Sequence, residues 1–246
     1  MKAALVTGAA RRIGAAIVRA LDQAGYAVAI HCRRQDADAE ALATSCHRAT
    51  IVTGDLADRD APAHIVKAAE AVLGPLSLLV NNASLFEDDR IGTLDPALFD
   101  RQMAVNLRSP ILLLEAFARQ LPAGAAGAVI NLIDQRVLKP TPDHVSYALS
   151  KAALWHATRM AAQALAPTIR VNAVAPGPVL PNHKDGPDAF AREAAALPLA
   201  SAVSPEAIAE AVVYLAAARH VTGQMIAVDG GQHLSWRTPD VLAVEP

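Results

Sequence analysis

The chain has 246 residues with a formal net charge of −2 and is 53% hydrophobic, and one α/β domain of this size buries a full core without disulfides or metal. Its apolar residues are spread over short runs and amphipathic stretches, so no membrane-spanning segment is expected. The near-neutral charge balance provides no basic stripe for a phosphate backbone, so no nucleic-acid partner is expected.

Short runs rich in Val, Ile, Leu and Ala alternate with longer helical patterns along the chain. The alternation predicts βαβ units, whose parallel strands are joined by right-handed crossovers. We therefore expect a Rossmann-type α/β fold, a doubly wound parallel sheet of seven strands with helices on both faces, in one domain over 1–246. The strands are expected at residues 3–6, 27–30, 50–53, 78–80, 128–132, 170–174 and 225–228.

The N-terminal segment MKAALVTGAARRIG begins a strand and loop at once. Its apolar run is too short, and too soon followed by arginine, for a signal peptide, so a cytoplasmic location is expected. Cys32 and Cys46 have no zinc-type spacing, and a disulfide is not expected in a reducing compartment. No metal site is predicted.

The first strand runs into the segment TGAARRIG, residues 7–14, which precedes an amphipathic helix. In this context Gly8 permits a tight turn and Gly14 permits close helix packing, while the helix N-terminus attracts anions. The segment predicts a dinucleotide pyrophosphate site that includes Arg11, Arg12 and Ile13, although a simple turn remains the alternative.

The second strand ends in His31, Cys32, Arg33 and Arg34, where an NAD-specific site would place an acidic residue. Guanidinium groups bind a 2′-phosphate bidentately, so His31, Arg33 and Arg34 favour NADPH as the cofactor. The alternative is a pair of solvated arginines that form ion pairs with nearby aspartates.

Further polar residues follow the third and fourth strands, at the sheet edge where a ligand crevice is expected. They are Asp55 with Leu56, and Asn82, Ala83 and Ser84. A loop rich in proline and glycine then opens a segment at about 177–203, which we interpret as a substrate lid. A surface excursion without function would have the same sequence pattern.

Tyr147 and Lys151 are four residues apart in a predicted helix, so their side chains share one face. An ammonium group beside a phenol is expected to lower its pKa, which makes Tyr147 the candidate general acid. Asp134 follows the fifth strand and reaches the same crevice if the intervening loop folds back. There it would bind a ring nitrogen or amino group, unless it serves only as a helix cap or loop residue.

Together these residues resemble the short-chain dehydrogenase/reductase superfamily over essentially the whole chain. The matching motifs are TGAARRIG, NNAS, Asn106 in VNL, the Tyr147–Lys151 spacing, Pro176 with Gly177, and VTG followed by DGG at 221–231. Three departures coincide: Arg12 replaces the middle glycine of the usual turn, NNAS replaces NNAG, and Asp134 replaces the usual catalytic serine. With Phe86 they resemble pteridine reductases and bacterial dihydromonapterin reductases.

The resemblance implies roles for individual residues. Phe86 would stack on the pterin ring, with Arg12, Ser84, Asp134 and Tyr147 around it, although core packing is the alternative for Phe86. Asn106 would order a water relay to Lys151, or would be a satisfied mid-helix asparagine. Pro176 and Gly177 would contact the cofactor, and the assembly would be a homotetramer.

The leading hypothesis is therefore NADPH-dependent reduction of a small-molecule pterin or dihydropterin, of the dihydromonapterin, dihydrobiopterin or dihydrofolate type. An ordinary carbonyl reductase or alcohol dehydrogenase, with Tyr147 protonating a ketone oxygen, is the second hypothesis. The third is a non-catalytic NADP-binding module, against which the intact Tyr147–Lys151 pair argues.

Overall fold

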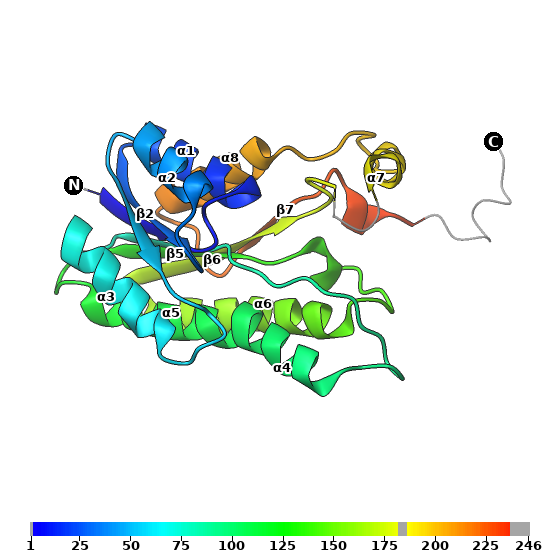
Figure 1. The fold of residues 1–246 in the computed structure, drawn as a ribbon, viewed down its shortest axis with the longest axis horizontal. Coiled ribbons are helices and arrows are strands. Elements are labelled where there is room, and N and C mark those ends of the chain that lie inside the picture. The colour runs from blue at the N-terminus through cyan, green and yellow to red at the C-terminus, as the bar shows by residue number, and fades with distance from the viewer. Residues whose placement is uncertain (1, 182–185, 237–246) are drawn as a thin grey trace, which may run out of the picture.

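The computed structural model describes residues 2–181 and 186–236. Within this part of the chain, one parallel sheet has the strand order β3-β2-β1-β4-β5-β6-β7 (Figure 1). The predicted fold is confirmed, and each predicted strand lies within an observed one. The strands are β1 Lys2–Val6, β2 Tyr26–Cys32, β3 Ala49–Thr53, β4 Leu78–Asn81, β5 Gly127–Leu132, β6 Ile169–Pro176 and β7 Met225–Val228.

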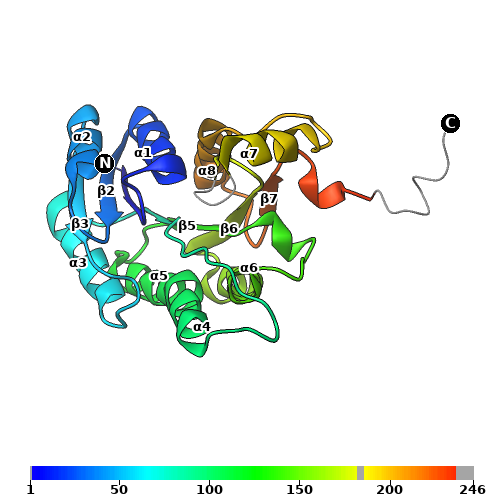
Figure 2. The same cartoon turned by 45° about the vertical axis from the view of Figure 1, so that its right-hand side comes forward.

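Helices cover both faces of the sheet, as the two views in Figures 1 and 2 show. One face carries α1 Arg12–Gln23, α2 Ala37–Ser45 and α8 Pro205–Ala217, and the opposite face carries α3 Ala61–Leu73, α4 Pro96–Met103, α5 Ser109–Gln120 and α6 Val145–Leu165. Because both faces are covered, the central strands are buried on both sides, which explains why they read as continuous apolar runs.

The direction of strand order reverses between β1 and β4. The chain proceeds from β1 outward to β3, then returns to β4 and continues outward to β7. Val6 pairs with Ile30 on one side and with Val80 on the other, so the segments after β1, β2 and β4 leave the sheet at the same edge. Open α/β sheets bind ligands at such a switch point.

Three short elements complete the described structure. A π-helical segment, Ala104–Arg108, joins α4 to α5, and short 3-10 helices span Gln135–Val137 and Gln232–Leu234. Helix α7, Gly186–Ala195, belongs to the predicted lid, of which residues 182–185 lie outside the described residues. Across the described part of the chain, no helix has the length and apolarity needed to cross a membrane.

Candidate active site

The turn after β1 depends on its two glycines. Gly8 has φ of +60°, and a Cβ there would lie 2.8 Å from the Cα of Ala83. At Gly14 a Cβ would lie 2.4 Å from the carbonyl oxygen of Gly8. Because side chains fit at neither position, α1 starts close against the turn. The Arg11 side chain, at the N-cap, makes no capping hydrogen bond, so backbone N–H groups of the first turn remain for an anion.

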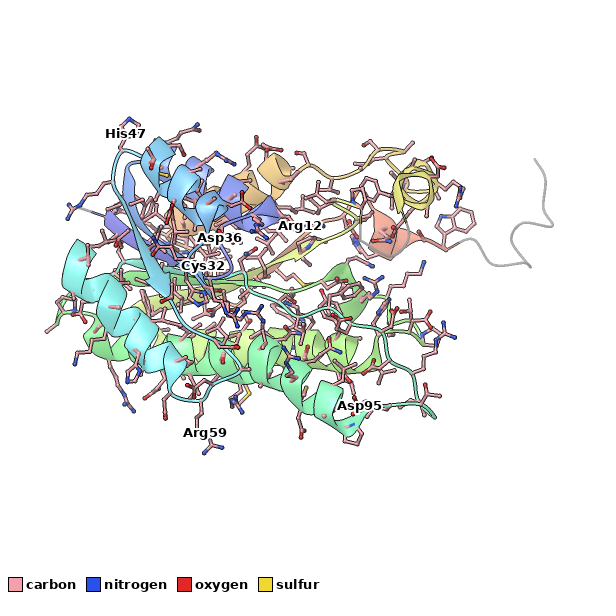
Figure 3. The ribbon with its side chains drawn as sticks, viewed as in Figure 1. Arg12, Cys32, Asp36, His47, Arg59 and Asp95 are labelled. Carbon is pink, nitrogen blue, oxygen red and sulfur yellow. The ribbon has the colours of Figure 1, made fainter. Side chains whose placement is uncertain are left out.

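Arg12 occupies the position where the superfamily pattern has glycine. Its φ of +53° lies in the left-handed region that glycine adopts freely, so the replacement keeps the shape of the turn at a cost of roughly 1–2 kcal/mol. The guanidinium at the start of α1, labelled in Figure 3, lies 3.4 Å from the carbonyl oxygen of Pro181 and 3.5 Å from that of Leu180. Arg12 thus connects the turn with the beginning of the segment predicted as a lid.

Asn82 and His31 hold the glycine turn from two sides. The Asn82 amide donates to the carbonyl oxygens of Thr7 at 2.8 Å and Gly8 at 3.0 Å. His31 Nδ1 accepts from the Gly8 N–H at 3.2 Å, so Nε2 carries the proton and donates to the Gly54 carbonyl at 3.0 Å. Burial lowers the pKa of His31, which favours this neutral tautomer.

A cavity of about 440 Å³ follows the turn toward the end of β2. Its size, and the small residues and arginines that line it, suit a dinucleotide. Most of the predicted cofactor residues line it, together with Arg101 and Val105, which the sequence analysis missed. The predicted ones are Gly8, Arg11, Arg12, Ile13, Gly14, His31, Arg33, Asp55, Leu56, Asn82, Ala83 and Ser84.

The arginines at the end of β2 differ in position. Arg33 lines the cavity, whereas Arg34 is exposed and is not among the lining residues. The ion pairs that formed the alternative interpretation of these arginines are made instead by Arg11, which contacts Asp38 and lies 2.6 Å from Asp36. Arg33 is therefore left to face the cavity.

A second cavity, of about 370 Å³, lies beside the first and shares Arg12, Ile13, Asn82 and Ser84 with it. It brings together the other predicted residues Phe86, Asp134, Tyr147, Lys151, Pro176 and Gly177. Arg136, Phe190, Glu193 and Gln232 also line it and were not predicted as individual site residues. Phe190 and Glu193 belong to α7, so the predicted lid segment forms part of the cleft wall.

Asp134 and Tyr147 are directly joined. The phenol hydroxyl donates to Asp134 Oδ2 at 2.8 Å, which shows that the loop after β5 folds back onto α6. Lys151 is 2% exposed, donates to the Leu132 carbonyl at 2.8 Å, and holds its ammonium 5.6 Å from the centre of the Tyr147 ring. Three ionisable side chains thus meet at the carboxyl end of β5.

The expected lowering of the Tyr147 pKa is wrong for this arrangement. Burial raises the pKa of Tyr147 well above that of a free phenol, and the charge and hydrogen bond of Asp134 raise it further. Burial also lowers the pKa of Lys151 to about 8, against an opposing effect of Asp134. At neutral pH the phenol therefore keeps its proton, as a general acid requires.

Asn106 is fully buried and uses its polar atoms within the protein. Its amide donates to the Leu85 carbonyl at 2.8 Å and to Ser150 Oγ at 3.1 Å, while its oxygen accepts from Leu85 N–H at 2.8 Å. These contacts support the interpretation of a satisfied mid-helix asparagine that fixes the loop after β4 against α6. The predicted water relay stays a prediction.

Asp89 caps the helix that carries Tyr147 and Lys151. This buried carboxylate accepts from the Ser146 N–H at 3.0 Å and from its hydroxyl, although 57 residues separate the two positions. A negative charge at a helix N-terminus is stabilising. No local motif marks Asp89, because the contact joins two distant loops.

Phe86 lies at the mouth of the cleft and is 38% exposed. Its ring makes an edge contact with Tyr147 at 4.7 Å between centroids and a tilted contact with His144 at 4.4 Å. This exposure argues against simple core packing and leaves ring surface available for a flat ligand.

Comparisons with known proteins agree with this geometry. A family model described as enoyl-(acyl carrier protein) reductase matches residues 8–233. Cis-4-hydroxycyclohexanecarboxylate dehydrogenase of Sinomonas cyclohexanicum is 37% identical over 243 residues, covering 94% of this chain and 96% of that protein. The 3-oxoacyl-(acyl-carrier-protein) reductase FabG of Staphylococcus aureus is 31% identical over 242 residues, with 95% and 98% covered.

Among solved structures, the chain is similar to FolM alternative dihydrofolate reductase 1 from Brucella canis, complexed with NADP. The two are 50% identical with a TM-score of 0.94, and the match covers 98% of this chain and 97% of that one. The chain therefore belongs to the short-chain dehydrogenase/reductase superfamily and is an NADP-dependent oxidoreductase that resembles the pteridine reductases.

Proposed function

We propose that this chain reduces a dihydropterin or pterin ring with NADPH. The observation that carries the proposal is the Tyr147–Asp134 pair, at 2.8 Å, in a cleft that also contains Phe86 and Arg12. An aromatic face, a carboxylate and a guanidinium together suit a flat heteroaromatic ring with a polar edge. The name of the Brucella canis relative, an alternative dihydrofolate reductase, supports the same substrate class.

In the proposed reaction, bound NADPH supplies the hydride. Phe86 holds the flat ring, and Asp134 accepts hydrogen bonds from its nitrogen-bearing edge. Tyr147 keeps its proton at neutral pH because burial and Asp134 raise its pKa, so it can donate that proton to a ring nitrogen. Lys151, buried behind the phenol, supplies the positive charge that stabilises the phenolate left after transfer.

Reduction of a carbonyl compound is the second candidate. It is favoured by the names of the two curated relatives, a hydroxycyclohexanecarboxylate dehydrogenase and a 3-oxoacyl reductase. In that reaction Tyr147 would protonate a ketone oxygen, and the carboxylate of Asp134 would have no ring edge to bind. The intact Tyr147–Lys151 pair argues against a non-catalytic module.

The two enzyme candidates are separated by one assay. NADPH oxidation is followed with dihydrobiopterin, dihydromonapterin and dihydrofolate in parallel with small ketones and a 3-oxoacyl thioester. We expect kcat/KM for at least one dihydropterin to exceed every carbonyl value by about tenfold or more, by analogy with sites built to bind polar edges. Preference for a ketone would contradict the proposal.

Removal of the Phe86 ring should weaken substrate binding selectively. We expect Phe86→Ala to raise KM for the dihydropterin roughly tenfold, because stacking of this kind contributes about 1–3 kcal/mol per base. KM for NADPH should change by less than about twofold. Phe99→Ala, on α4 and outside both cavities, is the matched control, and equal effects of Phe86→Ala on both KM values would remove Phe86 from the substrate site.

The exposed arginines at the end of β2 give a further prediction. We expect Arg33→Asp to weaken NADPH binding by about tenfold or more, because an aspartate repels the 2′-phosphate. The affinity for NADH should change little. Arg34→Asp should have the smaller effect, since Arg34 does not line the cavity. Fluorescence titration with both cofactors measures the ratio, and a larger effect at Arg34 would reverse this assignment.

A cytoplasmic location and a homotetramer complete the proposal. The exposed apolar residues Ile111 on α5 and Leu149 and Met160 on α6 support a subunit contact on these helices. Light scattering of the purified chain tests the tetramer.

A further inference from the structure

Arg136 is a cleft residue that neither the sequence motifs nor the proposed reaction uses. It lies in the short 3-10 helix after β5, Gln135–Val137, two residues beyond Asp134. Its side chain is 24% exposed. Its Nε is buried and has no hydrogen-bond partner among the described residues, so the guanidinium is held by few contacts of its own.

Both the backbone and the side chain of Arg136 contact the Asp134 carboxylate. The backbone N–H donates to Asp134 Oδ1 at 2.8 Å, and the guanidinium Nη1 lies 3.4 Å from Oδ2. The same Oδ2 accepts the hydrogen bond from the Tyr147 hydroxyl. One carboxylate oxygen is therefore shared between the proton donor and Arg136.

The same guanidinium also lies over the Phe86 ring, 5.7 Å from its centroid. Phe86 in turn makes the edge contact with Tyr147. A cation above an aromatic face is attracted to it, and the attraction grows in a partly buried site. Arg136 thus lies next to two groups with different proposed roles. The Asp134 carboxylate would bind the polar edge of the substrate, and the Phe86 ring would stack on its face.

Of the charged side chains around this cluster, Arg136 is the cation that pairs with Asp134. Lys151 stands behind Tyr147, on α6, and Arg12 and Glu193 line the same cleft from α1 and α7. Among these charged groups, Arg136 is the one whose side chain forms an ion pair with the Asp134 carboxylate. An opposite charge next to a partly buried carboxylate offsets the cost of removing that carboxylate from water.

We propose that Arg136 is a positioning residue that fixes the Asp134 carboxylate against Tyr147, next to the Phe86 ring. It acts through Asp134 and does not itself bind the substrate. The inference rests on the proposed function for its choice of substrate, but it concerns the geometry of the catalytic cluster.

A double-mutant cycle tests the proposal. Arg136→Met is combined with Asp134→Asn, and kcat, KM and the pH profile are measured with the best dihydropterin and with the best ketone. We expect Arg136→Met alone to lower kcat/KM about tenfold, but to lower it less than about twofold further in the Asp134→Asn background, as coupled residues do. Arg136→Lys should restore part of the loss, because it returns the charge without the planar group.

The control is Arg159→Met, which removes another guanidinium that lies over an aromatic ring, that of Trp155, outside the cleft. It should leave kcat/KM unchanged. Circular dichroism and thermal unfolding exclude variants that do not fold.

Two outcomes would overturn the proposal. Additive losses in the cycle would mean that Arg136 acts independently of Asp134, either as a direct substrate ligand or as part of the local structure. Equal activity of Arg136→Met and the parent would mean that it has no role. Failure of the proposed function has a different signature, because the parent enzyme would then not turn over any dihydropterin. The double-mutant cycle can in that case be measured with the ketone.

Discussion

Tyr147→Phe is expected to lower kcat by about 10²–10⁴-fold, which is the usual contribution of a positioned general acid. The hydroxyl is the group that donates to Asp134 at 2.8 Å, and its raised pKa keeps it protonated at neutral pH. The phenyl ring of the variant can retain the edge contact with Phe86, so the walls of the cleft should keep their shape. Affinity for NADPH should therefore stay within about twofold of the parent.

Steady-state kinetics and fluorescence titration with NADPH measure the two quantities. Tyr214→Phe is the matched control, because Tyr214 lies on α8 and is 57% exposed. Turnover by Tyr147→Phe at the parent rate would show that the proton comes from another group. A large loss of NADPH affinity would instead show that the substitution disturbs the cofactor cavity.

The fold was accessible from the sequence because each parallel strand in the middle of the sheet is buried on both faces. Such strands read as uninterrupted runs of Val, Ile, Leu and Ala, and the runs alternate regularly with helical patterns. The glycine turn was equally readable, since Gly8 and Gly14 stand where a Cβ would collide with backbone. Local rules were sufficient for these elements.

Contacts between distant segments were not accessible in the same way. Asp89 caps α6 across 57 residues, and Arg11, rather than Arg33 or Arg34, pairs with the aspartates at the start of α2. Neither contact leaves a pattern in the sequence, because both depend on how loops meet in space.

The direction of the Tyr147 pKa shift was missed for a related reason. Spacing on a helix shows that Lys151 is near the phenol, but it does not show how deeply the phenol is buried. Burial and the Asp134 carboxylate raise the pKa of Tyr147, and the positive charge that opposes them is that of Arg136. Sequence patterns thus identified the partners, whereas the sign of the effect required the geometry.

Lys151→Met is expected to abolish most of the activity and to stabilise the protein at neutral pH. Loss of a preorganised charge next to the reacting group typically lowers kcat by about 10²–10³-fold. Burial lowers the pKa of Lys151 to about 8, from 10.5 for a solvated lysine side chain, so the folded protein holds this ammonium at a cost of roughly 3 kcal/mol at pH 7. Methionine removes the charge at similar volume and forfeits one charged hydrogen bond to Leu132, worth about 1.5–3 kcal/mol, which leaves a net gain of up to about 1.5 kcal/mol.

The effect of Lys151 on the free energy of unfolding depends on pH, and its sign follows from the lowered pKa of the lysine. Below about pH 8 the lysine is protonated in both folded and unfolded chains, and the cost of burying its charge is present in full. Between about pH 8 and 10.5 the folded chain releases its proton while the unfolded chain keeps it, so this group makes the parent more stable as pH rises. The variant lacks that gain.

Thermal unfolding of both proteins from about pH 6 to 10.5 therefore tests the prediction. Lys151→Met should unfold a few degrees above the parent at pH 7, given about 2–4 °C per kcal/mol for a domain of this size. The difference between the two unfolding temperatures should shrink above about pH 8, because the parent becomes more stable there. If the variant unfolds below the parent at pH 7, the contacts of the ammonium with Leu132 and the field of Asp134 exceed its desolvation cost. The lysine would then stabilise the fold as well as the phenolate.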